Sequence, residues 1–148
     1  MQFQKINEKD PEKIYMTRYN NLAATLIAGE VIEFVETATA GATGLEIRTL
    51  TAAVNATTGV AAELAGVTTA AVAATTRFTA QVYGPANVRT ETTLTAGRLA
   101  VASSVSTTSK AALDIQTTTT TAAYAQAALG MSLAVTNATN ATIQLRLL

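Results

Sequence analysis

Apolar and polar residues alternate along much of this chain, in short segments separated by Gly, Asn or Pro. Residues 45–50 (LEIRTL) and 77–83 (RFTAQVY) place an apolar side chain at every second position, and Gly84-Pro85 is expected to end the second segment. Residues 31–36 are rich in β-branched and aromatic types, and residues 143–147 alternate again. A period of two with β-branched enrichment is typical of strands. The pattern predicts an all-β fold.

Alanine is the feature that argues most against strands, because it is the best helix former. Residues 122–129 (AAYAQAAL), which precede Gly130, are a candidate for one or two helical turns. Threonine is almost as abundant as alanine and is β-branched, which favours strands. We therefore expect a β domain with little helix.

The two halves of the chain resemble each other weakly. Residues 25–31 (TLIAGEV) resemble residues 93–99 (TLTAGRL), and the apolar segment after Gly59 resembles the one after Gly130. A duplication would let each half supply part of one barrel or sandwich. Chance similarity is the alternative, because 31 Ala and 28 Thr make the sequence low in complexity.

The composition changes near residue 20. Residues 1–20 hold seven of the 20 charged side chains, and their apolar residues are isolated and interrupted by Pro11. We predict an extended arm over residues 1–20 and a single β domain over residues 21–148. A frayed terminus is the alternative, since most N-termini are poorly ordered. A solvated tail has little need for aromatic and aliphatic side chains, so we expect the arm to bind a partner through Phe3, Ile6, Tyr15 and Tyr19, with Arg18 as a polar clamp.

The residue types present in the chain argue against most catalytic and metal-binding sites. The chain has no His, Cys or Trp, so the usual ligands of zinc, copper, haem and iron–sulfur clusters are absent. The serines near Lys110 lie in a Ser/Thr-rich segment, Asp114 stands apart from other carboxylates, and residues 41–44 (GATG) lack the Lys of a phosphate loop. We expect no enzyme, no catalytic residue, no metal and no cofactor.

Charge and core size indicate the kind of partner. The net charge is zero, which gives no electrostatic attraction to nucleic acid or to an anionic membrane. The start of the chain does not read as a signal peptide, and residues 50–76 are too polar for a membrane span. Because alanine buries little area, the core is thin, and association with other copies would add buried surface. We expect a homo-oligomer.

The order of segments along the chain resembles a known family. An Ala-Gly turn enters a strand at residues 28–32, a central strand covers residues 78–83, and a second Ala-Gly turn opens residues 95–101. Residues 128–134 (ALGMSLA) then lead through a polar turn to the last apolar strand. This order resembles the head decoration, or cement, proteins of tailed bacteriophages. Arg98 stands where that family commonly has an acid, and the Thr-rich stretch 103–121 is longer than expected.

The resemblance implies a small β-barrel or β-tulip-like domain that forms a homotrimer and grips the major capsid protein with its arms. The protein would be made in the host cytoplasm and act on the outer capsid surface of the virion, stabilising the head. The alternative is another virion surface module: a head fibre, a tail tube, or an adhesion domain for a glycan or receptor. Glycan binding usually needs exposed aromatic rings, and this chain has four Tyr and no Trp.

Overall fold

The computed structural model describes residues 12–34, 45–49, 64–90, 93–102, 112–114, 128–137 and 139–147. Within these residues every secondary-structure element is a strand, so the prediction of an all-β fold is confirmed. The strands are β1 (Ile14–Asn20), β2 (Val31–Phe34), β3 (Glu46–Thr49), β4 (Leu64–Thr68), β5 (Arg77–Arg89), β6 (Leu99–Ala102), β7 (Ala112–Asp114), β8 (Ala128–Asn137) and β9 (Asn140–Arg146). Of the candidate helix, residues 128–129 lie in β8, and residues 122–127 lie outside the described residues.

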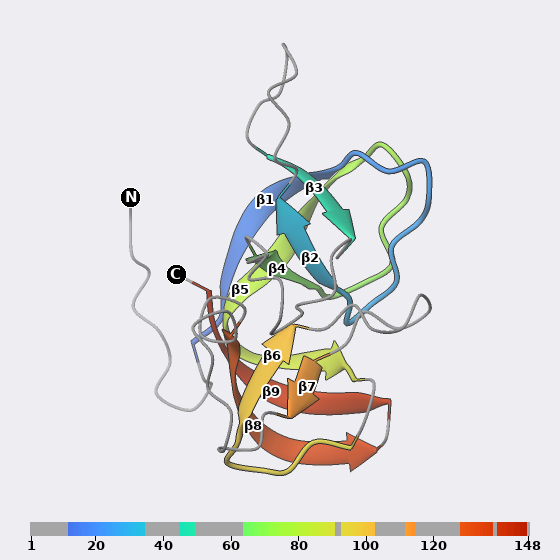
Figure 1. Ribbon diagram of the computed structural model, residues 1–148. Coiled ribbons are helices and arrows are strands. Elements are labelled where there is room, and N and C mark those ends of the chain that lie inside the picture. Colours follow the sequence, from blue (N-terminus) through green and yellow to red (C-terminus); the bar gives the residue numbers. More distant parts are fainter. Residues whose placement is uncertain are drawn as a thin grey trace, which may run out of the picture.

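The strands form one sheet that closes on itself in its first half. The order is β1-β3-β2-β4-β5-β9-β8-β6-β7, and β1 also pairs with β5. Strands β1, β3, β2, β4 and β5 therefore make a ring, in which β1 and β3 are parallel and the other pairs antiparallel. The ring matches the predicted small β-barrel. Figure 1 shows it above the second group of strands, with β5 passing from one group into the other.

The second group repeats the first. The order β3-β2-β4-β5 corresponds to β7-β6-β8-β9, and both orders contain the same antiparallel pairings. A turn glycine with φ 81° precedes both β2 and β6, at Gly29 and Gly97. A glycine with strongly positive φ lies beside a β-bulge in both β4 and β8, at Gly66 (142°) and Gly130 (146°). The similarity of residues 25–31 to residues 93–99 thus reflects a structural repeat. The structural counterpart of Gly130 is Gly66. Gly59, which the sequence comparison had matched to Gly130, lies outside the described residues.

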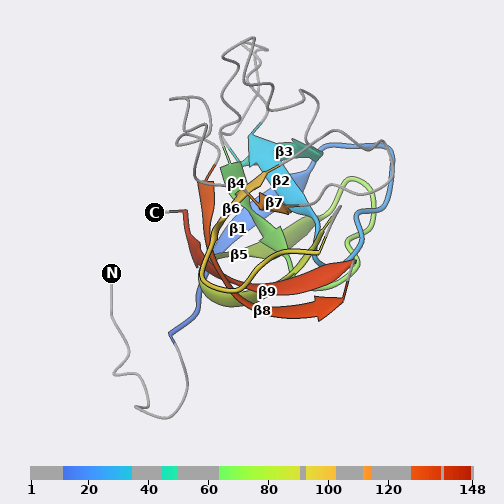
Figure 2. The same ribbon diagram turned by 60° about the horizontal axis from the view of Figure 1, so that its bottom comes forward.

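Strand β5 belongs to both halves. Its first part pairs with β1, where Tyr15 lies opposite Gln81, and its second part pairs with β9, where Pro85 lies opposite Gln144. The second part of β5 therefore has the same position in the second half as β1 has in the first half. It pairs with β9, just as β1 pairs with the first part of β5. After the rotation of Figure 2, β8 and β9 lie side by side at the front, with β5 behind them.

The predicted end of the central strand at Gly84-Pro85 is wrong, because β5 continues to Arg89. Backbone hydrogen bonds from Leu147 N to Val82 O and from Thr90 N to Thr139 O place the hydrogen-bonded pairs at the even-numbered residues of β5. The missing N–H of Pro85 would therefore point away from β9, on the side where β1 has ended. Proline is tolerated at such a position.

Two clusters of buried side chains form the core. The first lies inside the ring and contains Leu26, Ile32, Ile47, Ala65, Val72 and Ala80. The second is formed mainly by the second half and contains the equivalent positions Leu94, Ala100, Leu129 and Ile143. Val31 and Val67, from β2 and β4, join the second cluster and so attach the ring to the second half. Both clusters consist mostly of small and β-branched side chains.

The structure places residues 14–20 inside the sheet. β1 pairs with β5 over its whole length and with β3 at its end, and Asn20 is fully buried. The domain that was expected to begin at residue 21 thus includes β1. The physical reason is that β1 fills the last place in the ring, which would otherwise have two free edges.

Candidate functional site

The predicted partner-binding residues have different surroundings. Phe3 and Ile6 lie outside the described residues. Tyr15 is 46% exposed at the start of β1, and Tyr19 is half-buried near its end. Of the described residues in this group, Tyr15 offers the most surface to a partner.

Arg18 makes its contacts within the domain. Its side chain is only 5% exposed, its Nε donates to the carbonyl of Ala65 (2.9 Å) and its guanidinium lies over the ring of Phe34 (4.7 Å to the centroid). Burial lowers the pKa of the guanidinium, which nevertheless keeps its charge because the ordinary value is so high. These contacts tie β1 to β4 and β2. Arg18 and Asn20 share the inward face of β1, and because both are polar the sequence carried no signal for this role.

Exposed apolar side chains lie across the outer face of the second half. Leu99 of β6 lies directly opposite Met131 of β8, and they are 40% and 44% exposed. Leu133, two residues further along β8, is exposed to a similar degree. We call Leu99, Met131 and Leu133 the outer apolar row. The sequence did not single out this row, because it depends on which strands are neighbours.

The corresponding side chains in the first half of the repeat are buried, not exposed. The equivalent positions of the first half are Val31 and Val67, which also lie directly opposite each other and are fully buried against the second half. The second half has the larger side chains, Leu99 and Met131, at these positions and nothing in the described part of the chain covers them. Contiguous exposed apolar surface is a common feature of protein interaction sites.

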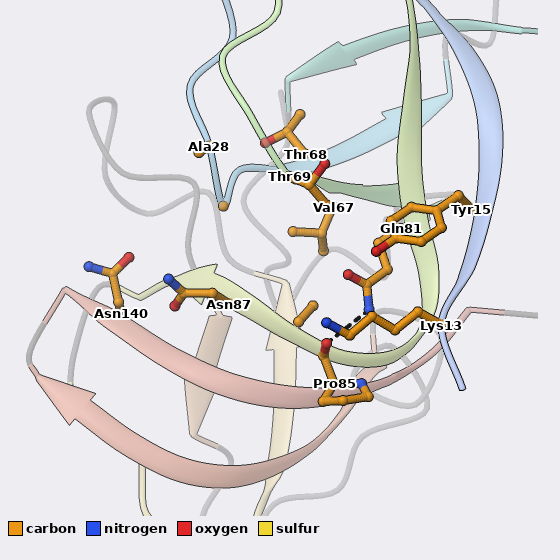
Figure 3. Close-up of a pocket in the computed structure, with 12 residues that line it drawn as sticks. Lys13, Tyr15, Ala28, Val67, Thr68, Thr69, Gln81, Pro85, Asn87 and Asn140 are labelled. Atoms are coloured by element: carbon orange, nitrogen blue, oxygen red, sulfur yellow. Dashed lines mark hydrogen bonds between the residues drawn. The ribbon is translucent and has the colours of Figure 1, made fainter. Parts of the chain in front are cut away.

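A polar cleft lies between the two halves, with a volume of about 340 Å³. Lys13, Tyr15, Thr69 and Gln81 line it from the first half, and Asn87 and Asn140 from the second. Figure 3 shows Tyr15, Gln81 and Lys13 on one side of the cleft, with Asn87 and Asn140 opposite them.

Neither a metal site nor a membrane-crossing helix is found in the part of the chain that the structure describes. No group of three or more acidic side chains lies close enough together to hold a metal ion among those residues. The same residues contain no helix with the length and apolar character needed to cross a membrane.

Comparison with known proteins gives a fold and no family. Neither a protein-family model nor a curated protein matches the chain. A crystal structure of the head fiber gp8.5 N base of bacteriophage phi29 superposes with a TM-score of 0.57 at 10% sequence identity. The match covers 92% of this chain and 96% of that chain. The two chains therefore share a fold over nearly all of their residues.

Proposed function

We propose that this protein is a structural protein of a bacteriophage virion that binds the outside of the capsid and stabilises the head. The observation that carries the proposal is the shared fold with a head fibre base, which covers both chains almost completely. The order of segments that resembles head decoration proteins supports it independently. An absence of grouped acidic residues in the described part of the chain is compatible with a structural role.

A head fibre base is the second candidate, and the same match favours it. Both roles require the domain to attach to the phage head. They differ in consequence, because a cement protein strengthens the shell whereas a fibre base need only hold its own fibre. Heating decorated and undecorated capsids separates them: a raised temperature of shell rupture supports cementing, and an unchanged one supports a fibre base.

We assign the outer apolar row to the capsid contact, together with the arm residues Phe3, Ile6, Tyr15 and Tyr19. A capsid surface is large and static, and interfaces with such surfaces draw most of their affinity from a few buried apolar or aromatic side chains. The protein would act as a homotrimer, which multiplies each contact by three and lets weak single contacts give firm attachment.

Replacing one residue of the row tests this contact. Met131→Lys should lower occupancy on empty capsids about tenfold or more, because a charge would be buried at an apolar interface. The thermal midpoint of the isolated protein should change little, since Met131 is exposed. Thr79→Lys is the matched control, as Thr79 is an exposed strand residue outside the row. Full decoration by Met131→Lys would contradict the assignment.

Two truncations test the arm. Removing residues 1–11 should lower capsid occupancy while leaving the thermal midpoint nearly unchanged. Removing residues 1–20 also removes β1, opens the ring and should unfold the domain. If the shorter truncation decorates capsids as fully as the whole chain, the arm is not part of the interface. Sedimentation of the whole chain tests the trimer, and a monomer both in solution and on the capsid would exclude it.

A further inference from the structure

The cleft between the two halves has the composition of a saccharide site. Three amide side chains (Gln81, Asn87 and Asn140), the hydroxyl of Thr69 and the ammonium of Lys13 line the cleft together with one exposed aromatic ring, Tyr15. Amides both donate and accept hydrogen bonds, as sugar hydroxyls do. An exposed tyrosine ring offers a flat apolar face with a polar tip, which suits the C–H face of a pyranose.

Gln81 is a preorganised acceptor in this cleft. The residue is only 2% exposed, and its Nε2 donates to the carbonyls of Tyr83 (3.1 Å) and Pro85 (3.0 Å). These two bonds fix the amide plane and leave Oε1 as an acceptor turned into the cleft (Figure 3). An amide held in this way loses little conformational entropy when a hydroxyl donates to it.

Asn87 faces Gln81 from the second half. Its side chain is exposed, and its amide makes no hydrogen bond with any other residue that the structure describes. The volume of about 340 Å³ lies at the lower end of the range for small-molecule pockets, which suits one or two sugar rings.

The repeat shows that the fold does not impose this polar set. In the second half, Leu133 and Pro85 occupy the positions that correspond to Thr69 and Tyr15. The first half therefore carries a hydroxyl and an aromatic ring where the same framework also accepts apolar residues.

The surroundings are less suited to a peptide. The second part of β5 pairs only with β9, so its other side is a strand edge beside the cleft. That edge is short, because Pro85 has no N–H, its carbonyl already accepts from Gln81 Nε2, and Arg89 N already donates to Gly29 O. Little of it is left for a peptide strand to pair with. The apolar residues of the lining are small ones such as Ala28 and Val67, which leaves no deep pocket for a large side chain.

We propose that this cleft binds a short saccharide of one or two pyranose rings, with acidic sugars preferred over neutral ones. The preference follows from Lys13, since no carboxylate is among the residues that line the cleft. This function does not rest on capsid attachment, with which it shares Tyr15 alone among the residues named for the two sites.

Saturation-transfer NMR on the whole chain tests the proposal with three probes: cellobiose, N,N′-diacetylchitobiose and digalacturonate. At about 10 mM probe, where even weak binding is populated, we expect saturation transfer to at least one disaccharide and the strongest to digalacturonate. Asn87→Ala should weaken binding about fivefold, the effect of one hydrogen bond. Asn21→Ala removes an exposed amide outside the cleft and should leave binding unchanged.

The outcomes separate this proposal from capsid binding. Met131→Lys should keep saccharide binding and lose capsid occupancy, whereas Asn87→Ala should do the reverse. Absence of saturation transfer from all three probes would overturn the saccharide site, as would equal binding by Asn87→Ala and Asn21→Ala. Binding of a capsid-derived peptide that Asn87→Ala weakens, without saccharide binding, would assign the cleft to a protein partner and also overturn it.

Discussion

Asn20 is the polar residue on which the end of the ring depends. Its side chain is fully buried, and Nδ2 donates to the carbonyls of Ala24 (3.0 Å) and Ala73 (2.9 Å). Oδ1 accepts from the backbone N–H of Leu22 (3.1 Å). One amide therefore joins the end of β1 to two separate loops, and all its hydrogen-bonding groups except one lone pair are used.

Replacing Asn20 by Ala would leave two carbonyls and one N–H without their partner. Each polar group left unsatisfied costs about 1–3 kcal/mol when buried, and these groups are only partly buried, so the lower end applies. We expect Asn20→Ala to lower the free energy of unfolding by about 3 kcal/mol. That is a large fraction of the stability of a typical domain, which is about 5–15 kcal/mol.

The repeat supplies a matched control at Thr90. Asn20 N donates to Thr76 O and Thr90 N donates to Thr139 O, both at 2.9 Å, so the two residues end equivalent strands. The hydroxyl of Thr90 is buried and has no hydrogen-bond partner. Thr90→Val should therefore leave stability unchanged or raise it by about 1 kcal/mol, because it removes an unsatisfied polar group and keeps the shape.

Urea unfolding followed by tyrosine fluorescence and far-UV circular dichroism measures both effects. For a chain of this length the expected loss for Asn20→Ala corresponds to a fall in thermal midpoint of about 6–12 °C. An unchanged m-value would show that the unfolded state is the same in the two variants. The reasoning is refuted if Asn20→Ala lies within about 0.5 kcal/mol of the wild type, or if Thr90→Val is the more destabilised variant.

Further substitutions test β1 and its approach to the sheet. Arg18→Ala should lower the free energy of unfolding by about 2 kcal/mol, because it removes a buried hydrogen bond and the contact with Phe34; reduced capsid occupancy without loss of stability in urea would contradict this. Gly84→Ala should destabilise the protein more than Gly97→Ala in calorimetry. Both glycines have positive φ, but a Cβ at Gly84 would overlap the carbonyl of Glu12, whereas one at Gly97 meets nothing within 4 Å and costs only about 1 kcal/mol of backbone strain. Equal shifts in thermal midpoint would count against the close approach at Gly84.

Much of the fold was accessible from the sequence because apolar alternation reports directly on burial. β3 and the start of β5 follow the predicted alternation, and the turn repeated at Gly29 and Gly97 was visible as similar sequence. β1 was missed as part of the domain because its inward residues include Arg18 and Asn20. A strand whose buried face is polar gives no hydrophobic pattern, and its burial depends on carbonyl partners far away in the chain.

The interaction sites were less accessible. The outer apolar row joins β6 and β8, and the cleft joins residues from Lys13 to Asn140, so no local spacing indicates either one. Tyr15 was predicted as an aromatic anchor for a partner, and it is 46% exposed in the structure. Its place beside Gln81 follows only from the pairing of β1 with β5.

The division of β5 between the two halves has a consequence for synthesis of the chain. Every strand of the ring comes from residues 14–83, so the ring can close on the ribosome before β9 has been translated. The later part of β5 is then an ordered strand without a partner on the β9 side. β9 can pair with it as soon as β9 has left the ribosome. A chain released early, or cleaved after β5, would keep that strand as a free edge and recruit the β9 of another copy. Exchange of β9 between chains is therefore the misassembly to which this architecture is most exposed.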